Sequence, residues 1–232
     1  MTGHAAFAEM ASIMDSTDGA EDRRLPESHA AWDDLIQAVG PASLLVVIEA
    51  RASHALKQRY SSEDILQDAL LHAWRDRRQC EWRGLKSFRS WLLAIIDHRI
   101  HEAVVYEGAA KRGGGQTPVL TSFRDSSTSA SQPPSSPDEP VISTTPSRVA
   151  MFREQADAMR AALETLSLDL REVVRLRLFE QRSILEIAEQ LGIGESAVRH
   201  RFRKGTTLYQ ATLRTELMSR SLPSSMGAAR IP

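Results

Sequence analysis

The sequence predicts an all-α protein built as two small helical domains joined by a flexible linker. Apolar residues recur every three or four positions from about residue 31 to 106 and again from 148 to 218, the period of a helix with one buried face. No stretch alternates apolar and polar residues for long enough to indicate a strand. Between these parts, residues 113–148 begin with three glycines and are mostly Ser, Thr and Pro, which predicts a linker.

Composition limits the class of protein. The 232 residues carry 42% hydrophobic and 25% charged side chains, as soluble globular proteins do. Because the formal net charge is −1, any surface that binds nucleic acid must be a local patch. A single cysteine, Cys80, excludes an internal disulfide and a multi-cysteine zinc site. We expect a cytoplasmic protein with no membrane span, since no signal peptide and no apolar run of about 20 residues is present.

Residues 29–112 form the first predicted domain, preceded by an acidic tail at 1–28. Three helices are expected, over residues 44–56, 65–74 and 91–104. Ser61 or Ser62 can cap the second of them, with acidic residues in its first turn. Trp74 and Trp91 lie on apolar faces and are expected in the core, whereas Trp82 lies in a polar stretch and can be a stacking platform.

Residues 149–218 form the second predicted domain, followed by a small-residue tail at 219–232. Residues 183–204 have the pattern of a helix-turn-helix: Ser183 caps a first helix, Gly192 ends it in a left-handed conformation, and Gly194 caps the second. The apolar residues expected to hold this unit together are Ile184, Ile187, Ala188, Leu191, Ile193, Val198 and Phe202. Its supporting core is expected upstream, at Leu163, Leu166, Leu170, Val173, Val174, Leu176 and Phe179.

The second helix of this unit is basic on the side that faces away from the apolar residues. No acidic residue occurs from Ser196 to Thr215. Such a helix suits the major groove of DNA, where arginine reaches guanine edges and lysine reaches phosphates. A solvated basic face on an ordinary helical hairpin is the alternative. The candidate DNA-binding residues are Ser196, Arg199, His200, Arg201, Arg203 and Lys204.

The stretch ALETLSLDLREVVRLRLFEQRSILEIAEQLGIGESAVRHRFRKG resembles the fourth conserved region of sigma-70-type factors. The resemblance implies that this helix-turn-helix binds the −35 promoter element. The recognition helix of the family often begins Ser-Glu-Gly-Thr-Val-Lys-Ser-Arg, and the same positions here are residues 194–201. Gly194 and Ala197 replace Ser and Thr, and His200 replaces a small base-facing residue, so a different promoter sequence is expected.

The stretch SEDILQDALLHAWRDRRQCEWRGLKSFRSWLLAIIDHRIHEAVVYEGAAKR resembles the second conserved region of the same factors. In the family, a helix of this form docks on the clamp helices of the polymerase β′ subunit. The docking residues that the resemblance implies are Asp64, Gln67, Asp68 and Leu71, which share one helical face. By themselves, these residues fit a solvated acidic helix equally well.

FRSWLLAII and the polar helix that follows resemble the segment that reads and opens the −10 element. The family usually has Asn where this chain has His98. The resemblance implies cations for the DNA backbone and a pocket for an extruded base. The candidate residues are Arg89, His98, Arg99, His101, Lys111 and Arg112.

Two such regions in this order, separated by a linker, identify the chain as similar to the small, two-domain extracytoplasmic-function (ECF) sigma factors. The linker and the residues around the second helix resemble planctomycete variants. The resemblance implies core RNA polymerase as partner, through its β′ clamp helices and β flap, together with promoter DNA and an anti-sigma factor in some members. It implies no enzymatic activity and no cofactor. An extended linker of this length spans at most about 120 Å, enough to bridge two promoter elements.

Two alternatives come from other classes of protein. A helix-turn-helix regulator that never joins polymerase would bind palindromic DNA as a dimer, although no dimerisation heptad is evident. A metalloenzyme is suggested by the segment Asp97-His98-x-x-His101-Glu102. Its order matches no zinc-hydrolase motif, and no distant third ligand stands out.

Overall fold

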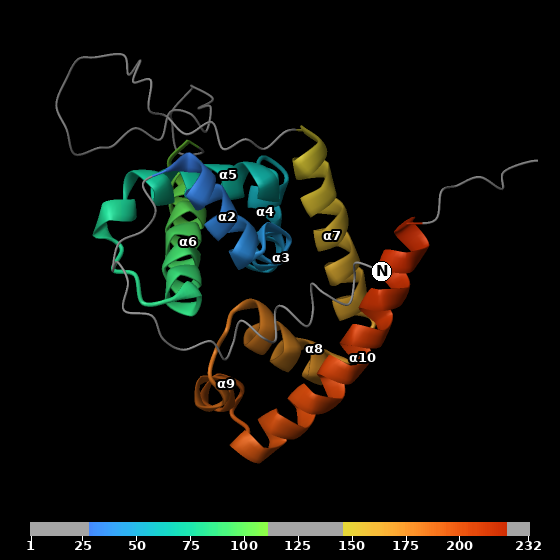
Figure 1. The fold of residues 1–232 in the computed structure, drawn as a ribbon. Helices are drawn as coiled ribbons and strands as arrows, with labels where there is room; N and C mark the ends of the chain where they lie inside the picture. Colours follow the sequence, from blue (N-terminus) through green and yellow to red (C-terminus); the bar gives the residue numbers. More distant parts are fainter. Residues whose placement is uncertain (1–27, 111–145, 222–232) are drawn as a thin grey trace, which may run out of the picture. The chain divides into compact units, whose positions relative to one another are not determined.

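The computed structural model describes residues 28–110 and 146–221, and every regular element in these two ranges is helical (Figure 1). The chain divides into two compact units, with the boundary after Val149. This confirms the predicted all-α class. The predicted tails and the linker lie almost wholly outside the described residues. Among the described helices, none is by itself both long and apolar enough to cross a membrane; α2 and α3 meet that test only together, across a 61° bend.

The first unit contains α2 (His29–Val39), α3 (Pro41–Arg51), α4 (His54–Lys57), α5 (Ser62–Arg75), the 3₁₀ turn η1 (Arg77–Gln79) and α6 (Leu85–Ala110). The long helix α6 packs along α5, and α2 and α3 also lie against it (Figure 1). An aromatic cluster fills the centre. In it, the ring of Trp32 lies 5.4 Å from Trp74 and 5.6 Å from Phe88, both edge to face.

The entry to this unit differs from the sequence-based expectation. Helix α2 is an additional helix that precedes the three expected ones. It ends at Val39 with Gly40 as its cap, whose φ of 82° favours glycine, and Pro41 begins the next helix. The Gly-Pro pair is the signal that marks this break. The single helix predicted over residues 44–56 is wrong, because Ser53 begins a new one: its Oγ accepts a bond from the backbone N of Leu56 at 3.3 Å. Helix α3 is also not amphipathic, since every residue from 41 to 48 is buried.

The second unit contains α7 (Pro146–Glu164), α8 (Leu168–Val174), the π-helical turn η3 (Arg175–Phe179), α9 (Ile184–Leu191) and α10 (Glu195–Ser221). The predicted domain was bounded by residues 149 and 218. Helix α7 begins three residues before the first of these and α10 ends three residues after the second. Helix α8 crosses α10, and α9 packs against the first part of α10 (Figure 1). The predicted supporting core is confirmed, because all seven of its residues are at most 9% exposed: Leu163, Leu166, Leu170, Val173, Val174, Leu176 and Phe179.

The crossing of α8 and α10 depends on Gly205. A Cβ atom built on this glycine would lie 2.6 Å from Cγ2 of Val174 and 3.4 Å from the backbone oxygen of Leu170. Val174 is fully buried and β-branched, so its side chain has little freedom to move away. The absence of a side chain at Gly205 therefore allows the two helices to approach closely.

We predict that Gly205→Ala destabilises the second unit by about 1–3 kcal/mol, because overpacking outweighs the higher helix propensity of alanine. Hydrogen exchange of the amides in α8 and α10 of the full chain measures the loss. Gly194→Ala is the matched control, since a Cβ there meets nothing within 4 Å. Equal exchange in the two variants would contradict the close-contact explanation.

Candidate nucleic-acid and protein interfaces

The sequence-predicted DNA-binding residues lie at the start of α10. Successive residues of a helix are about 100° apart, which brings positions 196, 199, 200 and 203 onto one stripe, with 204 at its edge. All five side chains are exposed: Ser196, Arg199, His200, Arg203 and Lys204. Val198, on the opposite side, is fully buried. The start of α10 therefore presents a row of cations to solvent while its apolar side holds the helix in place.

Arg201 does not belong to this row. Its guanidinium lies 3.1 Å from the carboxylate of Asp169, in the first turn of α8, and its side chain is only 31% exposed. Arg199 does point outward but also pairs with Glu195, one turn earlier, at 2.5 Å. Both of the Arg199–Glu195 side chains are well exposed, so this pair contributes little to stability and costs little to open.

Local sequence determines where the recognition helix begins. Ser183 and Glu186 form a capping box at the start of α9: the Ser183 Oγ accepts from the Glu186 backbone N at 3.2 Å, and the Glu186 carboxylate accepts from the Ser183 backbone N at 2.6 Å. Gly192 ends α9 with a φ of 64°. The backbone oxygen of Gly194 then accepts from Val198. These positions confirm the predicted helix-turn-helix. The Ser-x-x-Glu spacing of Ser183 and Glu186 is the sequence signal for this capping box.

The apolar centre of the helix-turn-helix is also as predicted. Ile187 and Val198 are fully buried with Ala188 beside them, and they join Val173 of α8 in one cluster. The remaining predicted members pack around it and are partly buried: Ile184, Leu191, Ile193 and Phe202. The orientation of the cationic row is therefore fixed by packing on its reverse side.

The predicted docking face lies on α5 and is smaller than the sequence suggests. Gln67 is exposed and Leu71 is half-buried on the same side of the helix. Asp64 is exposed too, but its carboxylate accepts from the Ser61 backbone N at 3.2 Å while the Ser61 Oγ accepts from the Asp64 backbone N at 3.1 Å. Asp64 therefore also caps α5, and Ser61 is the cap rather than Ser62.

Asp68 and Arg99 face each other inside the first unit rather than facing two different partners. The Nε of Arg99 donates to Asp68 across the α5–α6 contact at 2.6 Å, and the side chains are 7% and 15% exposed. Arg99 also pairs with Glu102. Burial, and then the positive charge of Arg99, lower the pKa of His72, which lies 3.8 Å from Asp68. The roles of Asp68 in docking and of Arg99 in DNA binding stay predictions, and in this structure each of the two side chains is paired with the other.

Arg89 is buried as well. Its side chain donates to the backbone oxygen of Val39 at 2.7 Å and to the Oγ of Ser43 at 2.9 Å, and the residue is 3% exposed. Burial lowers the pKa of Arg89 to about 10, so the guanidinium is still charged at neutral pH. Arg89 joins α6 to the junction of α2 and α3, and its side chain does not reach the described surface.

Two of the six candidates for the −10 element remain on the described surface, His98 and His101, both exposed on α6. Lys111 and Arg112 lie outside the described residues. Trp74 is buried beneath the guanidinium of Arg77, 3.7 Å from the ring centre, which confirms its place in the core. Trp91 and Trp82 are half-buried, and each ring contacts Phe88.

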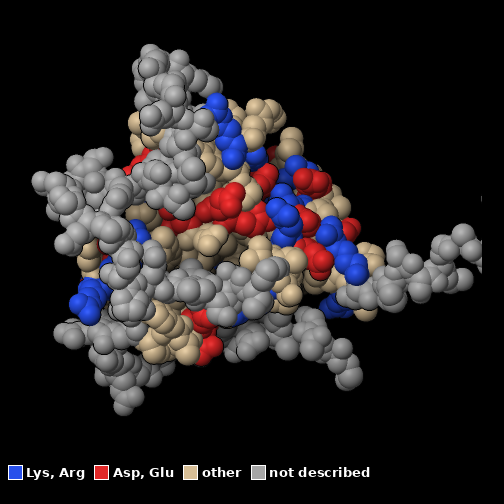
Figure 2. Space-filling view, turned by 90° about the horizontal axis from the view of Figure 1, so that it is seen from above, with Lys and Arg blue, Asp and Glu red and all other residues tan. Residues whose placement is uncertain are grey.

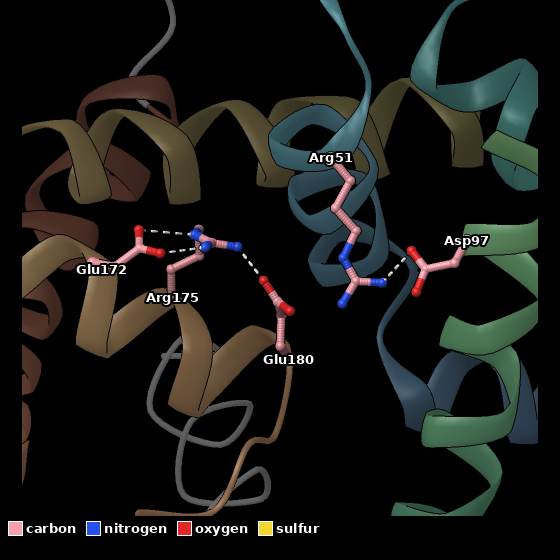
Figure 3. A network of polar contacts seen from close by, with 5 residues as sticks. All are labelled: Arg51, Asp97, Glu172, Arg175 and Glu180. Carbon is pink, nitrogen blue, oxygen red and sulfur yellow. Dashed lines mark hydrogen bonds and ion pairs between the residues drawn. The ribbon is translucent and has the colours of Figure 1, made fainter. Parts of the chain in front are cut away.

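Figure 3 shows further ion pairs in both units. In the first unit, the guanidinium of Arg51 lies 2.5 Å from Asp97 and joins the end of α3 to α6. In the second, Arg175 bridges Glu172 and Glu180 on either side of the π-helical turn. Within the described ranges, no three His, Cys, Asp or Glu side chains are close enough to hold a metal ion.

Acidic and basic side chains are interspersed on the face of the molecule drawn in Figure 2, which agrees with the net charge of −1. Positive charge is therefore not spread over this whole face. The cationic row at the start of α10 is a local feature of one helix.

Comparison with known proteins assigns both units. Residues 44–108 match the family model for sigma-70 region 2, and residues 156–205 match the model for sigma-70 region 4. The chain is 29% identical over 172 residues to a probable RNA polymerase sigma factor, RfaY, of Xanthomonas campestris, covering 73% of this chain and 37% of that protein. It is 27% identical over 168 residues to the ECF RNA polymerase sigma factor SigX of Bacillus subtilis, covering 71% and 78%.

The two matches fall on the two units in the order that the sequence predicted. The region 2 match covers α3 to α6 nearly completely, and the region 4 match runs from the second half of α7 to the first part of α10. The chain spans little more than a third of the length of RfaY but over three quarters of SigX. With both regions present and a relative of ECF type matched over most of its length, the chain belongs to the sigma-70 family of RNA polymerase sigma factors, as a member of the ECF type.

Proposed function

We propose that this protein joins core RNA polymerase through the exposed face of α5, reads the −35 promoter element with α10 and contacts the −10 element with α6. It would act in the cytoplasm, where it would confer promoter recognition on the polymerase without catalysing a reaction itself. Binding to an anti-sigma factor is part of the same proposal. The two DNA contacts are individually weak and reinforce each other when both are made at once.

The row of exposed cations on α10 carries this proposal. Arg199, His200, Arg203 and Lys204 face solvent from a helix whose reverse side is packed against α8 and α9. A rigid helix with this charge fits the major groove, where its side chains can reach base edges and phosphates. A regulator that works without polymerase would bind DNA with the same helix. Binding of polymerase to the exposed face of α5 therefore distinguishes a sigma factor from such a regulator.

Run-off transcription with purified core polymerase tests the proposal directly. We expect the full chain to co-elute with core and to support initiation at a subset of promoters from its source genome. A protein that neither co-elutes nor initiates at any of them would overturn the proposal. A stable dimer on palindromic DNA, measured by light scattering, would favour the regulator instead.

We predict that Asp64→Ala with Gln67→Ala weakens binding to core polymerase about tenfold, because an acidic and an amide contact to a basic partner helix are lost. Binding of the full chain to a −35 duplex should be unchanged, since that contact is made by α10. Fluorescence titration with core and with the duplex measures both affinities.

The control for this variant is Ser61→Ala, because Asp64 also caps α5. Ser61→Ala removes the reciprocal cap without touching the proposed docking side chains. We expect it to leave affinity for core within about twofold of wild type, as it loses only local helix stability. Equal loss of affinity in the two variants would assign the effect to helix capping and contradict a docking role.

A further inference from the structure

His72 lies in the contact between α5 and α6, beside an ion pair that joins the two helices. Its Nε2 atom is 3.8 Å from Oδ1 of Asp68, and the other oxygen of that carboxylate accepts from Nε of Arg99 at 2.6 Å. The side chain of His72 is 21% exposed, and those of Asp68 and Arg99 are buried further, at 15% and 7%. The imidazole therefore shares one largely buried carboxylate with a guanidinium that is always charged.

Charged groups of both signs act on the ring of His72. Asp68 and Asp76 favour a proton on it, whereas Arg99 of α6 and Arg75 of α5 oppose one. Burial, and then the charge of Arg99, outweigh the effect of Asp68 and lower the pKa of His72 below its ordinary value of 6.5. The neutral ring is therefore the form that this contact accommodates.

From this arrangement we infer that His72 is a pH sensor whose protonation weakens the contact between α5 and α6. A protonated ring places a second cation beside the carboxylate that Arg99 already occupies, in a space from which water is largely excluded. The imidazolium loses hydration there, and it repels the guanidinium on the other side of that carboxylate. Because the packing of α5 against α6 holds the first unit together, the whole unit loses stability.

Mild acid destabilises the folded unit because its His72 resists protonation. In the unfolded chain, histidine takes up a proton with a pKa of about 6.5, whereas in the folded unit the ring does so only at lower pH. The stabilising effect is therefore fully present above pH 6.5, and it is lost as the pH falls from there through the lowered pKa of His72. Carboxylates ordinarily titrate near about pH 4, so they contribute little to this step.

The sensor lies under the surfaces that the proposed function uses but does not depend on that function. Weakening the contact between α5 and α6 lowers the fraction of the protein that can present α5 to polymerase. The inference therefore adds a response to acid that polymerase and DNA binding do not require. For the same reason it is tested on the free full chain.

The test is urea unfolding of the full chain at pH 7.5 and at pH 5.5, followed by tryptophan fluorescence, since all four tryptophans lie in the first unit. We expect the unfolding midpoint of the wild-type protein, measured relative to that of His72→Gln, to be lower at pH 5.5 than at pH 7.5. Glutamine is polar and of similar length but takes up no proton in this range. The matched control is His54→Gln on α4, an exposed position, whose midpoint should differ from wild type by the same amount at both pH values.

Two outcomes overturn the inference. One is a midpoint difference between the wild-type protein and His72→Gln that stays constant, or rises, as the pH falls. If His72→Gln fails to fold, NMR titration of the wild-type chain follows the assigned ring of His72 directly. Titration below pH 6.5 supports the inference by linkage, and titration at or above pH 6.5 is the second outcome that overturns it. Neither measurement involves polymerase, so failure here leaves the proposed function standing, and absence of initiation leaves the sensor standing.

Discussion

Replacing Arg199 and Arg203 together with alanine is expected to weaken binding to the −35 duplex about 100-fold, since each arginine that reaches a base or phosphate contributes about 1–3 kcal/mol. Both side chains project from the outer stripe of α10. The pair of Arg199 with Glu195 is exposed and can open at little cost. Fluorescence anisotropy of the full chain on labelled duplex, at several salt concentrations, measures the affinity and the decrease in its salt dependence.

Arg201→Ala is the matched control for this pair of substitutions. It removes the same charge from the same helix, but from a side chain that contacts Asp169 of α8. We expect affinity for the duplex to stay within about threefold of wild type, the size of a long-range charge effect. If Arg201→Ala lowered affinity for the duplex as much as Arg203→Ala does, the side of α10 next to α8 would have to contact DNA.

Arg89→Ala is expected to destabilise the first unit by about 3 kcal/mol. The substitution leaves a cavity and removes charged donors from the backbone oxygen of Val39 and the Oγ of Ser43. All four tryptophans of the chain lie between residues 32 and 91. Tryptophan fluorescence during urea unfolding of the full chain therefore reports on this unit selectively.

The control for Arg89→Ala is Arg83→Ala, in the loop before α6, where the side chain is 69% exposed. We expect no measurable change of stability there, as for other exposed positions. If Arg89→Ala kept full stability but lost affinity for −10 DNA, Arg89 would instead have to contact DNA.

Sequence patterns predicted those parts of the fold that depend on local chemistry. Ser183, Gly192 and the apolar spacing around Val198 determine the helix-turn-helix within about 20 residues, and the structure follows that prediction. The cationic stripe could be predicted for the same reason: residues one turn apart share a face. Among the residues that the structure describes, the cations of that stripe have no buried acidic partner.

Long-range pairing could not be predicted in this way. Arg89 and Arg99 are basic residues in a segment that resembles a DNA-reading helix, and nothing in their immediate sequence shows that they face inward. Their partners come from 31 to 50 residues away, at Asp68, Ser43 and Val39. A cation next to apolar residues can face either solvent or the protein interior. The packing of α5 and α3 against α6 decides which of the two it does.

The cationic stripe on α10 has opposite consequences for the free and the DNA-bound protein when ionic strength changes. Arg199 and Arg203 are four residues apart, as are His200 and Lys204, and like charges at this spacing repel when both are charged. Added salt screens that repulsion and so favours the free helix, while the same salt competes with phosphate contacts and weakens the complex. At high salt, repulsion between the cations of the helix is therefore smallest and its affinity for DNA is lowest.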